Sequence, residues 1–140
     1  MATDTTIWHA AFPSPVSSPN RISREELHAR LAKGDRDIQV VDVRRTDFEL
    51  AFIKGAINLP AHSFYPTLSG LVPILYRYKQ VVFHCQSCSA TGRGVRAAGW
   101  FQDALNEQGI KADVCEALIL DGGIKGWVEE YKEDPWTIFL

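Results

Sequence analysis

A short apolar strand that runs into a cysteine, a glycine-containing loop and then a helix constrains this fold more than any other feature. The segment is VVFHCQSCSATGRGVRAAGW, residues 81–100. Its first three residues are apolar, which is typical of a buried strand, and the helical pattern of residues 94–108 ends at Gly109. A helix N-terminus presents unpaired backbone N–H groups and the positive end of the helix dipole. The segment therefore predicts a strand, a loop suited to an anion, and a covering helix.

Apolar strands alternate with helical segments along the rest of the chain. Strands are predicted at residues 39–43, 56–59, 81–84 and 114–120. Helices are predicted at 24–33, behind a capping box, and at 94–108 and 124–131, with two short helical pieces in 63–78 separated by Pro66 and Pro73. This order predicts an α/β fold with a parallel central sheet of about five strands, flanked by helices on both faces.

The chain is long enough for one domain with its own core, and its first part differs in composition from the rest. Residues 1–21 are rich in proline and serine and predict an extended N-terminal arm. Trp8 and Phe12 are expected to hold this arm against the body, since large apolar side chains are rarely left in water. Residues 22–140 are expected to form the single folded domain.

Charge and cysteine usage restrict the partners and the compartment. A net charge of −2 argues against nucleic acid and against an anionic membrane surface, because both favour a basic protein face. No apolar run approaches the roughly 20 residues of a membrane span. The three cysteines lack the spacing of a disulfide framework, so reduced thiols and a cytoplasmic or nuclear location are expected. We expect a monomer or a weak dimer.

Three motifs together resemble the rhodanese superfamily. VVDVRRTDFELAFIKGAINLPA, residues 40–61, is similar to the first signature, and LDGGIKGWVEEY, residues 120–131, to the second. Cys85 lies between them at a strand end, where rhodanese enzymes place their cysteine. WHAAFPSP and GRGVRAAGWFQD are similar to a fungal branch near the cell-cycle dual-specificity phosphatases of this fold and the related arsenate reductases. The resemblance implies a rhodanese-like fold for residues 22–140.

The length of the active-site loop separates the activities within the family that this chain resembles. Sulfurtransferases have a six-residue loop beginning at cysteine, and the phosphatase and arsenate reductase branch has seven residues, Cys-x5-Arg. Here Cys85 to Arg93 is Cys-x7-Arg, whereas Cys88 to Arg93 spans six residues. Both cysteines are therefore candidate nucleophiles. Position favours Cys85, because it directly follows the strand and faces the helix N-terminus, which lowers a thiol pKa.

The loop residues suggest how an anion is bound and attacked. A Cys85 thiolate is expected to attack the central atom of a bound oxyanion or a sulfane sulfur, with Arg93 gripping the oxygens. Cys88 is a candidate resolving thiol, since it follows Cys85 by three residues. Asp42 and Arg44 are expected to form an ion pair that supports the loop. The predicted anion-binding residues are Gln86, Ser87, Ser89, Ala90, Thr91 and Gly92.

The resemblance implies a cysteine-dependent phosphatase or arsenate reductase, with no bound cofactor or metal and with glutathione or another thiol as co-substrate. A sulfurtransferase that carries a persulfide from thiosulfate or a mercaptan is the first alternative, and a non-catalytic protein-binding module is the second. The expected partner is a small anionic substrate, a sulfur donor or a phosphoprotein. A phosphoester also needs a general acid. The candidates are Asp42, Asp47, Glu49, Asp103 and Glu116, which the sequence does not rank.

Overall fold

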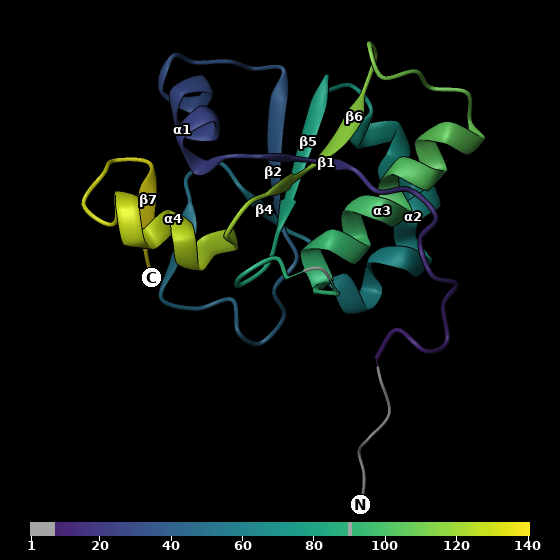
Figure 1. Ribbon diagram of the computed structural model, residues 1–140, viewed down its shortest axis with the longest axis horizontal. Helices are drawn as coiled ribbons and strands as arrows, with labels where there is room; N and C mark the ends of the chain where they lie inside the picture. Colours follow the sequence, from purple (N-terminus) through teal and green to yellow (C-terminus); the bar gives the residue numbers. More distant parts are fainter. Residues whose placement is uncertain (1–7, 90) are drawn as a thin grey trace, which may run out of the picture.

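A five-stranded parallel sheet forms the centre of the computed structural model, which describes residues 8–89 and 91–140 (Figure 1). The strand order is β1-β6-β5-β2-β4, and every neighbouring pair is parallel. This confirms the α/β fold and the sheet predicted from the sequence. The strands are β1 (Asn20–Ile22), β2 (Ile38–Asp42), β4 (Ile57–Asn58), β5 (Gln80–His84) and β6 (Glu116–Leu120).

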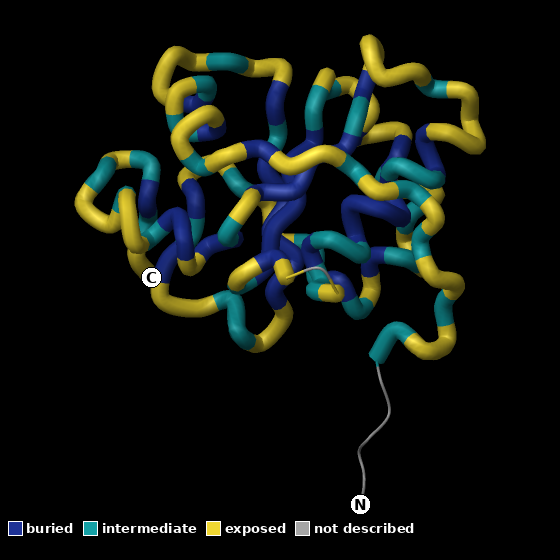
Figure 2. The backbone as a smooth tube through the Cα atoms, in the orientation of Figure 1, coloured by how far each residue is buried: buried dark blue, intermediate teal, exposed yellow. Residues whose placement is uncertain are grey.

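Helices cover both faces of this sheet, as predicted. On one side lie α2 and α3, and on the other lie α1 and α4 (Figure 1). The alternation of side chains along β5 explains the two cores: Val81 and Phe83 pack under α2 and α3, while Val82 packs under α1 and α4. The sheet is buried on both sides (Figure 2). The helices are α1 (Arg24–Ala32), α2 (Ala61–Leu75), α3 (Arg93–Glu107) and α4 (Gly123–Tyr131).

The predicted division of residues 63–78 into two helical pieces was wrong, because α2 is one continuous helix. Pro66 and Pro73 lie inside it. A proline within a helix costs about 3 kcal/mol. Against this, Phe64 and Val72 are 1% exposed and pack in the core beside α3, and each such side chain contributes about 1.5–3 kcal/mol on burial. Tertiary packing therefore keeps the helix intact across both prolines.

The N-terminal arm lies along α3 and ends in the sheet. The indole N–H of Trp100 donates a hydrogen bond to the carbonyl of Pro13 at 2.8 Å. Trp8 and Phe12 each pack edge-on against Trp100, with ring centroids 5.9 Å apart. The last residues of the arm then pair with β6 as strand β1, at the edge of the sheet. The arm thus covers the outer side of the helix that follows the cysteine loop.

The C-terminal tail forms a second, two-stranded sheet. Strand β7 (Thr137–Phe139) pairs antiparallel with β3 (Ala51–Ile53), and the indole N–H of Trp127 on α4 donates to the Thr137 hydroxyl at 2.8 Å. These contacts fix the end of the β2–β3 loop beside α4. Within the described part of the chain, no helix is long and apolar enough to cross a membrane.

Candidate active site

The loop after β5 lies at the carboxyl end of the parallel sheet, where ligand sites of α/β folds open. Cys85 directly follows β5, and α3 begins at Arg93. The first turn of α4 holds the loop, because the amide of Ile124 donates to the carbonyl of Cys85 at 3.1 Å. Gly123 has φ +60°, and a Cβ there would lie 2.4 Å from the Gln86 carbonyl oxygen. Glycine is thus required where α4 supports the cysteine loop.

The surroundings of the buried Cys85 thiol stabilise its thiolate form. Only 4% of the residue is exposed. The pKa of Cys85 is lowered to about 5, although burial alone would raise it. The largest cause is a hydrogen bond from the Cys88 thiol, and the backbone N–H groups of Gly94 and Cys88 and the charge of Arg93 also contribute. A free thiol titrates near 8.5. The thiolate of Cys85 is therefore favoured at neutral pH, with the Cys88 thiol as the largest cause and the helix N-terminus, through the Gly94 amide, as a smaller one.

Cys88 is the protonated partner of that thiolate. It is 3% exposed, and its φ of +54° lies in the left-handed region that residues other than glycine rarely adopt. Arg21 donates to its carbonyl at 3.2 Å. The hydrogen bond to Cys85, burial and the charge of Cys85 together hold the pKa of Cys88 far above its usual range. The two sulfurs therefore share one proton, and the negative charge resides on Cys85.

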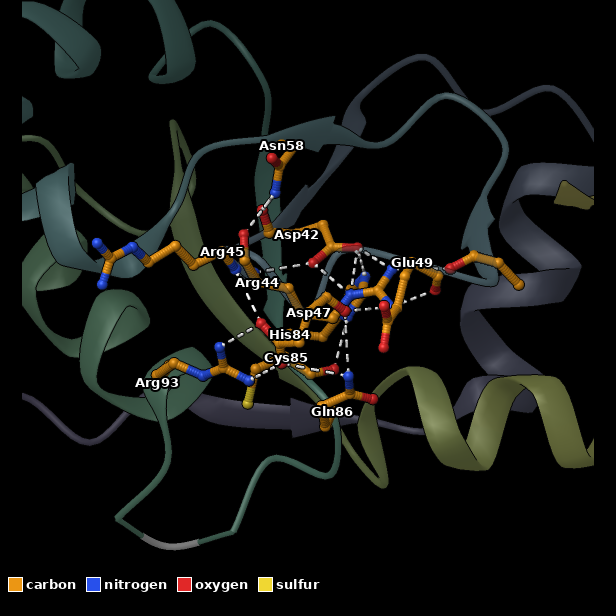
Figure 3. Close-up of polar contacts among 11 residues, drawn as sticks. Asp42, Arg44, Arg45, Asp47, Glu49, Asn58, His84, Cys85, Gln86 and Arg93 are labelled. Carbon is orange, nitrogen blue, oxygen red and sulfur yellow. Dashed lines mark hydrogen bonds and ion pairs between the residues drawn. The ribbon is translucent and has the colours of Figure 1, made fainter. Parts of the chain in front are cut away.

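Arg93 joins the cysteine to a carboxylate that the sequence did not assign to it. Its Nη1 and Nη2 atoms donate to Asp47 Oδ1 and Oδ2 at 2.8 and 2.6 Å (Figure 3). The guanidinium also contacts the Cys85 sulfur, and both neighbours raise the pKa of Arg93. Gln86 Nε2 donates to Asp47 as well, at 3.2 Å. Because Arg93 holds the pKa of Asp47 well below its usual range, this carboxyl is ionised and is no proton donor in this state.

Asp42 and Arg44 form the buried ion pair that the sequence predicted. They are 0% and 2% exposed, and Arg44 Nη2 lies 2.7 Å from Asp42 Oδ2 (Figure 3). The guanidinium also donates to the carbonyls of Glu49 and Ala51 at 3.2 and 2.8 Å. Glu49 follows Asp47 in the β2–β3 loop, and Ala51 begins β3. The ion pair therefore supports the cysteine loop indirectly, through the contact between Asp47 and Arg93.

The other predicted anion-binding residues have different positions. Gln86 binds Asp47, and Gly92 is the N-cap of α3. Ser87, Ser89 and Thr91 are exposed, and Ala90 lies outside the described residues. The backbone N–H groups that demonstrably point at the Cys85 sulfur belong to Cys88 and Gly94. The Cys88 amide lies within the run of loop amides, residues 86–92, that the sequence predicted to face the anion. The Gly94 amide lies beyond that run, and the helix start predicted at residue 94 was the signal that could have identified it.

We expect alkylation of Cys85 to report the thiolate directly. The rate of reaction with iodoacetamide should rise with pH through about 5 and then remain level across neutral pH, because the thiolate is the reactive form. Replacing Cys88 with alanine removes the principal hydrogen-bond donor and should move this midpoint upward. Cys88→Ser is the matched control, since its hydroxyl retains a donor. A midpoint near 8.5 in the wild type would contradict the assigned environment.

Comparison with known proteins places this geometry in a family context. The rhodanese-like domain family matches residues 23–130. Arsenical-resistance protein 2 of Saccharomyces cerevisiae is 30% identical over 127 residues, which cover 85% of this chain and 95% of that protein. Arsenate reductase 2.2 of rice is 32% identical over 94 residues, with coverage of 66% and 71%. Dual specificity phosphatase ibp1 of Schizosaccharomyces pombe is 22% identical over 130 residues, with coverage of 83% and 93%.

Two solved structures share the fold. Ygr203w, a yeast protein tyrosine phosphatase of the rhodanese family, superposes with a TM-score of 0.74 and 24% identity over 87% of this chain and 93% of its own. The As-Sb reductase from Leishmania major superposes with a TM-score of 0.67 and 23% identity, with coverage of 85% and 84%. The described architecture is therefore common to this chain and to both structures.

Proposed function

The chain belongs to the rhodanese-like domain family, as its motifs predicted, and on this basis we propose that it is a cysteine-dependent arsenate reductase that acts through Cys85. The relatives as a group support an enzyme of the phosphatase or reductase type. Those named for arsenic resistance and arsenate reduction share 30% and 32% identity with this chain, against 22% for the phosphatase. Small oxyanions are thus the proposed substrate class.

The observation that carries this proposal is the buried Cys85 thiolate beside Arg93. A thiolate that exists at neutral pH needs no general base to attack arsenic. Arg93 contacts the same sulfur and supplies fixed positive charge for the oxygens, and the Gly94 amide adds a donor from the helix N-terminus. Attack displaces one oxygen and leaves an arsenic adduct on Cys85. A thiol co-substrate such as glutathione is proposed as the external source of electrons.

The carboxyl groups near the loop support reduction over ester hydrolysis. Four of the five sequence candidates for a general acid are otherwise engaged or distant. Asp42 is ion-paired with Arg44, and Asp47 is ionised by Arg93. Asp103 accepts from the amide of Val16 in the arm at 2.9 Å. Glu116 begins β6, at the opposite end of the parallel sheet from Cys85. Of the five candidates, the exposed Glu49 is the one left as a general acid. Arsenate reduction needs such an acid less than phosphoester cleavage does.

A phosphatase is the second candidate, and one cavity favours it. The cavity has a volume of about 350 Å³ and adjoins the cysteine loop at Gln86. Its apolar lining comes from the β2–β3 loop, α4 and the C-terminal strand, with Leu50, Val128 and Phe139 among the residues. Arsenate is too small to need this space, whereas the organic group of a phosphoester, including a phosphoprotein side chain, would fit it.

Three parallel reactions test the proposal. The reduced protein is incubated with arsenate and glutathione, with para-nitrophenyl phosphate, and with thiosulfate and cyanide. We expect arsenite to accumulate catalytically in the first reaction. Phosphate release without arsenite would replace the proposal with the second candidate. Thiocyanate production with a persulfide on one cysteine would replace it with the sulfurtransferase alternative, and inactivity in all three would favour a non-catalytic protein-binding module.

A further inference from the structure

Two thiols occupy the cysteine loop, and both adjoin Gly94 in the first turn of α3. The Cys88 thiol donates a hydrogen bond to the Cys85 sulfur, and both residues are less than 5% exposed. The Cys88 sulfur and the Cys85 amide both lie 3.1 Å from the point that a Cβ at Gly94 would occupy. The absence of a side chain at Gly94 therefore leaves room for the Cys88 sulfur against the backbone of Cys85.

The backbone holds Cys88 in an unfavourable conformation to achieve this contact. A residue with a Cβ pays roughly 1–2 kcal/mol in the left-handed region, and Cys88 is there at φ +54°. Backbone strain of this kind persists where surrounding contacts impose it, and it is concentrated at functional sites. The hydrogen bond from Arg21 to the Cys88 carbonyl is one such contact. By contrast, Cys115 lies in the core between β6 and α2, with its thiol 3.9 Å from the Leu75 carbonyl.

We propose that Cys88 is the resolving thiol of the reaction, so that the chain itself supplies both electrons for one reduction of arsenate. This inference rests on the proposed function. First, the Cys85 thiolate forms a bond to arsenic, and the displaced oxygen leaves as water with the Cys88 proton. Next, the Cys88 thiolate attacks the Cys85 sulfur, and the sulfur–arsenic bond breaks with its electron pair remaining on arsenic. Arsenate and two thiols thus yield arsenite, one disulfide and one water.

The charges in the loop give the two thiols their order of reaction. Before arsenate binds, the hydrogen bond to Cys85, burial and the Cys85 charge keep the pKa of Cys88 high. Once the Cys85 sulfur is bonded to arsenic, its charge and its capacity to accept that hydrogen bond are reduced. Two of the three causes then weaken, and the pKa of Cys88 falls. Cys88 is therefore protonated when Cys85 must attack and becomes more acidic when its own attack is required.

The proposal changes the role of the external thiol. The thiol is not needed to release arsenite from Cys85 and instead reduces the Cys85–Cys88 disulfide after the product has formed. The reaction that must follow each turnover is thus a thiol–disulfide exchange, supplied by glutathione or by a protein dithiol.

A single-turnover experiment without added thiol tests this role. The full-length protein is reduced, desalted under anaerobic conditions and mixed with excess arsenate. We expect about one arsenite per chain, a decrease from three free thiols to one, and a disulfide that peptide mapping assigns to Cys85 and Cys88. Phosphate in place of arsenate is the matched control for stray oxidation, because it accepts no electrons. Cys115→Ser should give the same yield as the wild type.

The Cys88→Ser variant separates the proposed reducing role of Cys88 from its hydrogen bond to Cys85. Its hydroxyl retains a donor to Cys85, but it has no sulfur to form the disulfide. We expect this variant to release no arsenite alone and to release it when glutathione is added. Wild-type protein that makes arsenite only with glutathione would overturn the role of Cys88 and leave the proposed function intact. Wild-type protein that makes none under either condition would overturn the proposed function as well.

Discussion

Replacing Cys85 with serine is expected to reduce arsenite production by about four orders of magnitude or more, the scale seen when a covalent nucleophile is removed. The serine hydroxyl has a pKa far above that of the thiol, so it stays protonated at neutral pH. Arg93 and the Gly94 amide would then surround a neutral group. Steady-state rates with arsenate and glutathione, together with circular dichroism as a check of folding, measure this effect.

The matched control for this substitution is Cys115→Ser. Cys115 is fully buried in the core, and a serine there retains a donor toward the Leu75 carbonyl. Its activity is expected to equal that of the wild type. Substantial turnover by Cys85→Ser, combined with loss of turnover in Cys88→Ser even in the presence of glutathione, would identify Cys88 as the nucleophile. That result would favour the six-residue loop that begins at Cys88.

Replacing Asp42 with asparagine is expected to lower the free energy of unfolding by about 3–5 kcal/mol, because it removes one partner of a buried ion pair and leaves the other charged. Arg44 is 2% exposed, so its charge would be left in a largely buried position. The loss is a large fraction of the 5–15 kcal/mol that is typical of a domain. Urea unfolding followed by tryptophan fluorescence measures it.

Asp121→Asn provides the control for an exposed ion pair. Asp121 lies 3.2 Å from Arg21, with side chains that are 67% and 39% exposed, and such pairs contribute about 1 kcal/mol at most. Equal unfolding midpoints for the two variants would show that the Asp42–Arg44 pair does not stabilise the fold. Activity of the folded fraction of Asp42→Asn should also fall, since the loop that carries Asp47 is anchored by Arg44.

Local patterns predicted much of the fold. The run of apolar residues before Cys85 and the glycine after the next helix each act over a few neighbours, and β5 and α3 formed as expected. The continuity of α2 and the pairing of β7 with β3 were not predicted. Both depend on contacts between distant parts of the chain, namely the packing of Phe64 and Val72 and the tail that returns to Ala51. The low helix propensity of proline does not indicate whether packing against distant residues will keep a helix continuous.

The candidate site was predictable in its residues and less so in its contacts. The position of Cys85 after the strand and the Asp42–Arg44 pair followed from the sequence. The counting of loop residues did not distinguish Cys85 from Cys88, because loop length says nothing about which sulfur receives hydrogen bonds. Asp47 was one of several acidic residues in the sequence, and its bond to Arg93 joins positions 46 residues apart. Only the folded chain reveals that pairing.

The bond between Asp47 and Arg93 has a consequence for anion selectivity, if the substrate binds at Arg93 as proposed. The guanidinium already holds a bidentate carboxylate, so an incoming oxyanion competes with a tethered anion for the same cation. The binding free energy is then the difference between two similar interactions, and abundant anions such as sulfate and phosphate gain little from it. Anions are accordingly distinguished less by how tightly they bind than by the covalent step, in which only an anion that is attacked by the Cys85 sulfur reacts. An anion that binds thus displaces Asp47 from Arg93, and only an anion that reacts with Cys85 is converted.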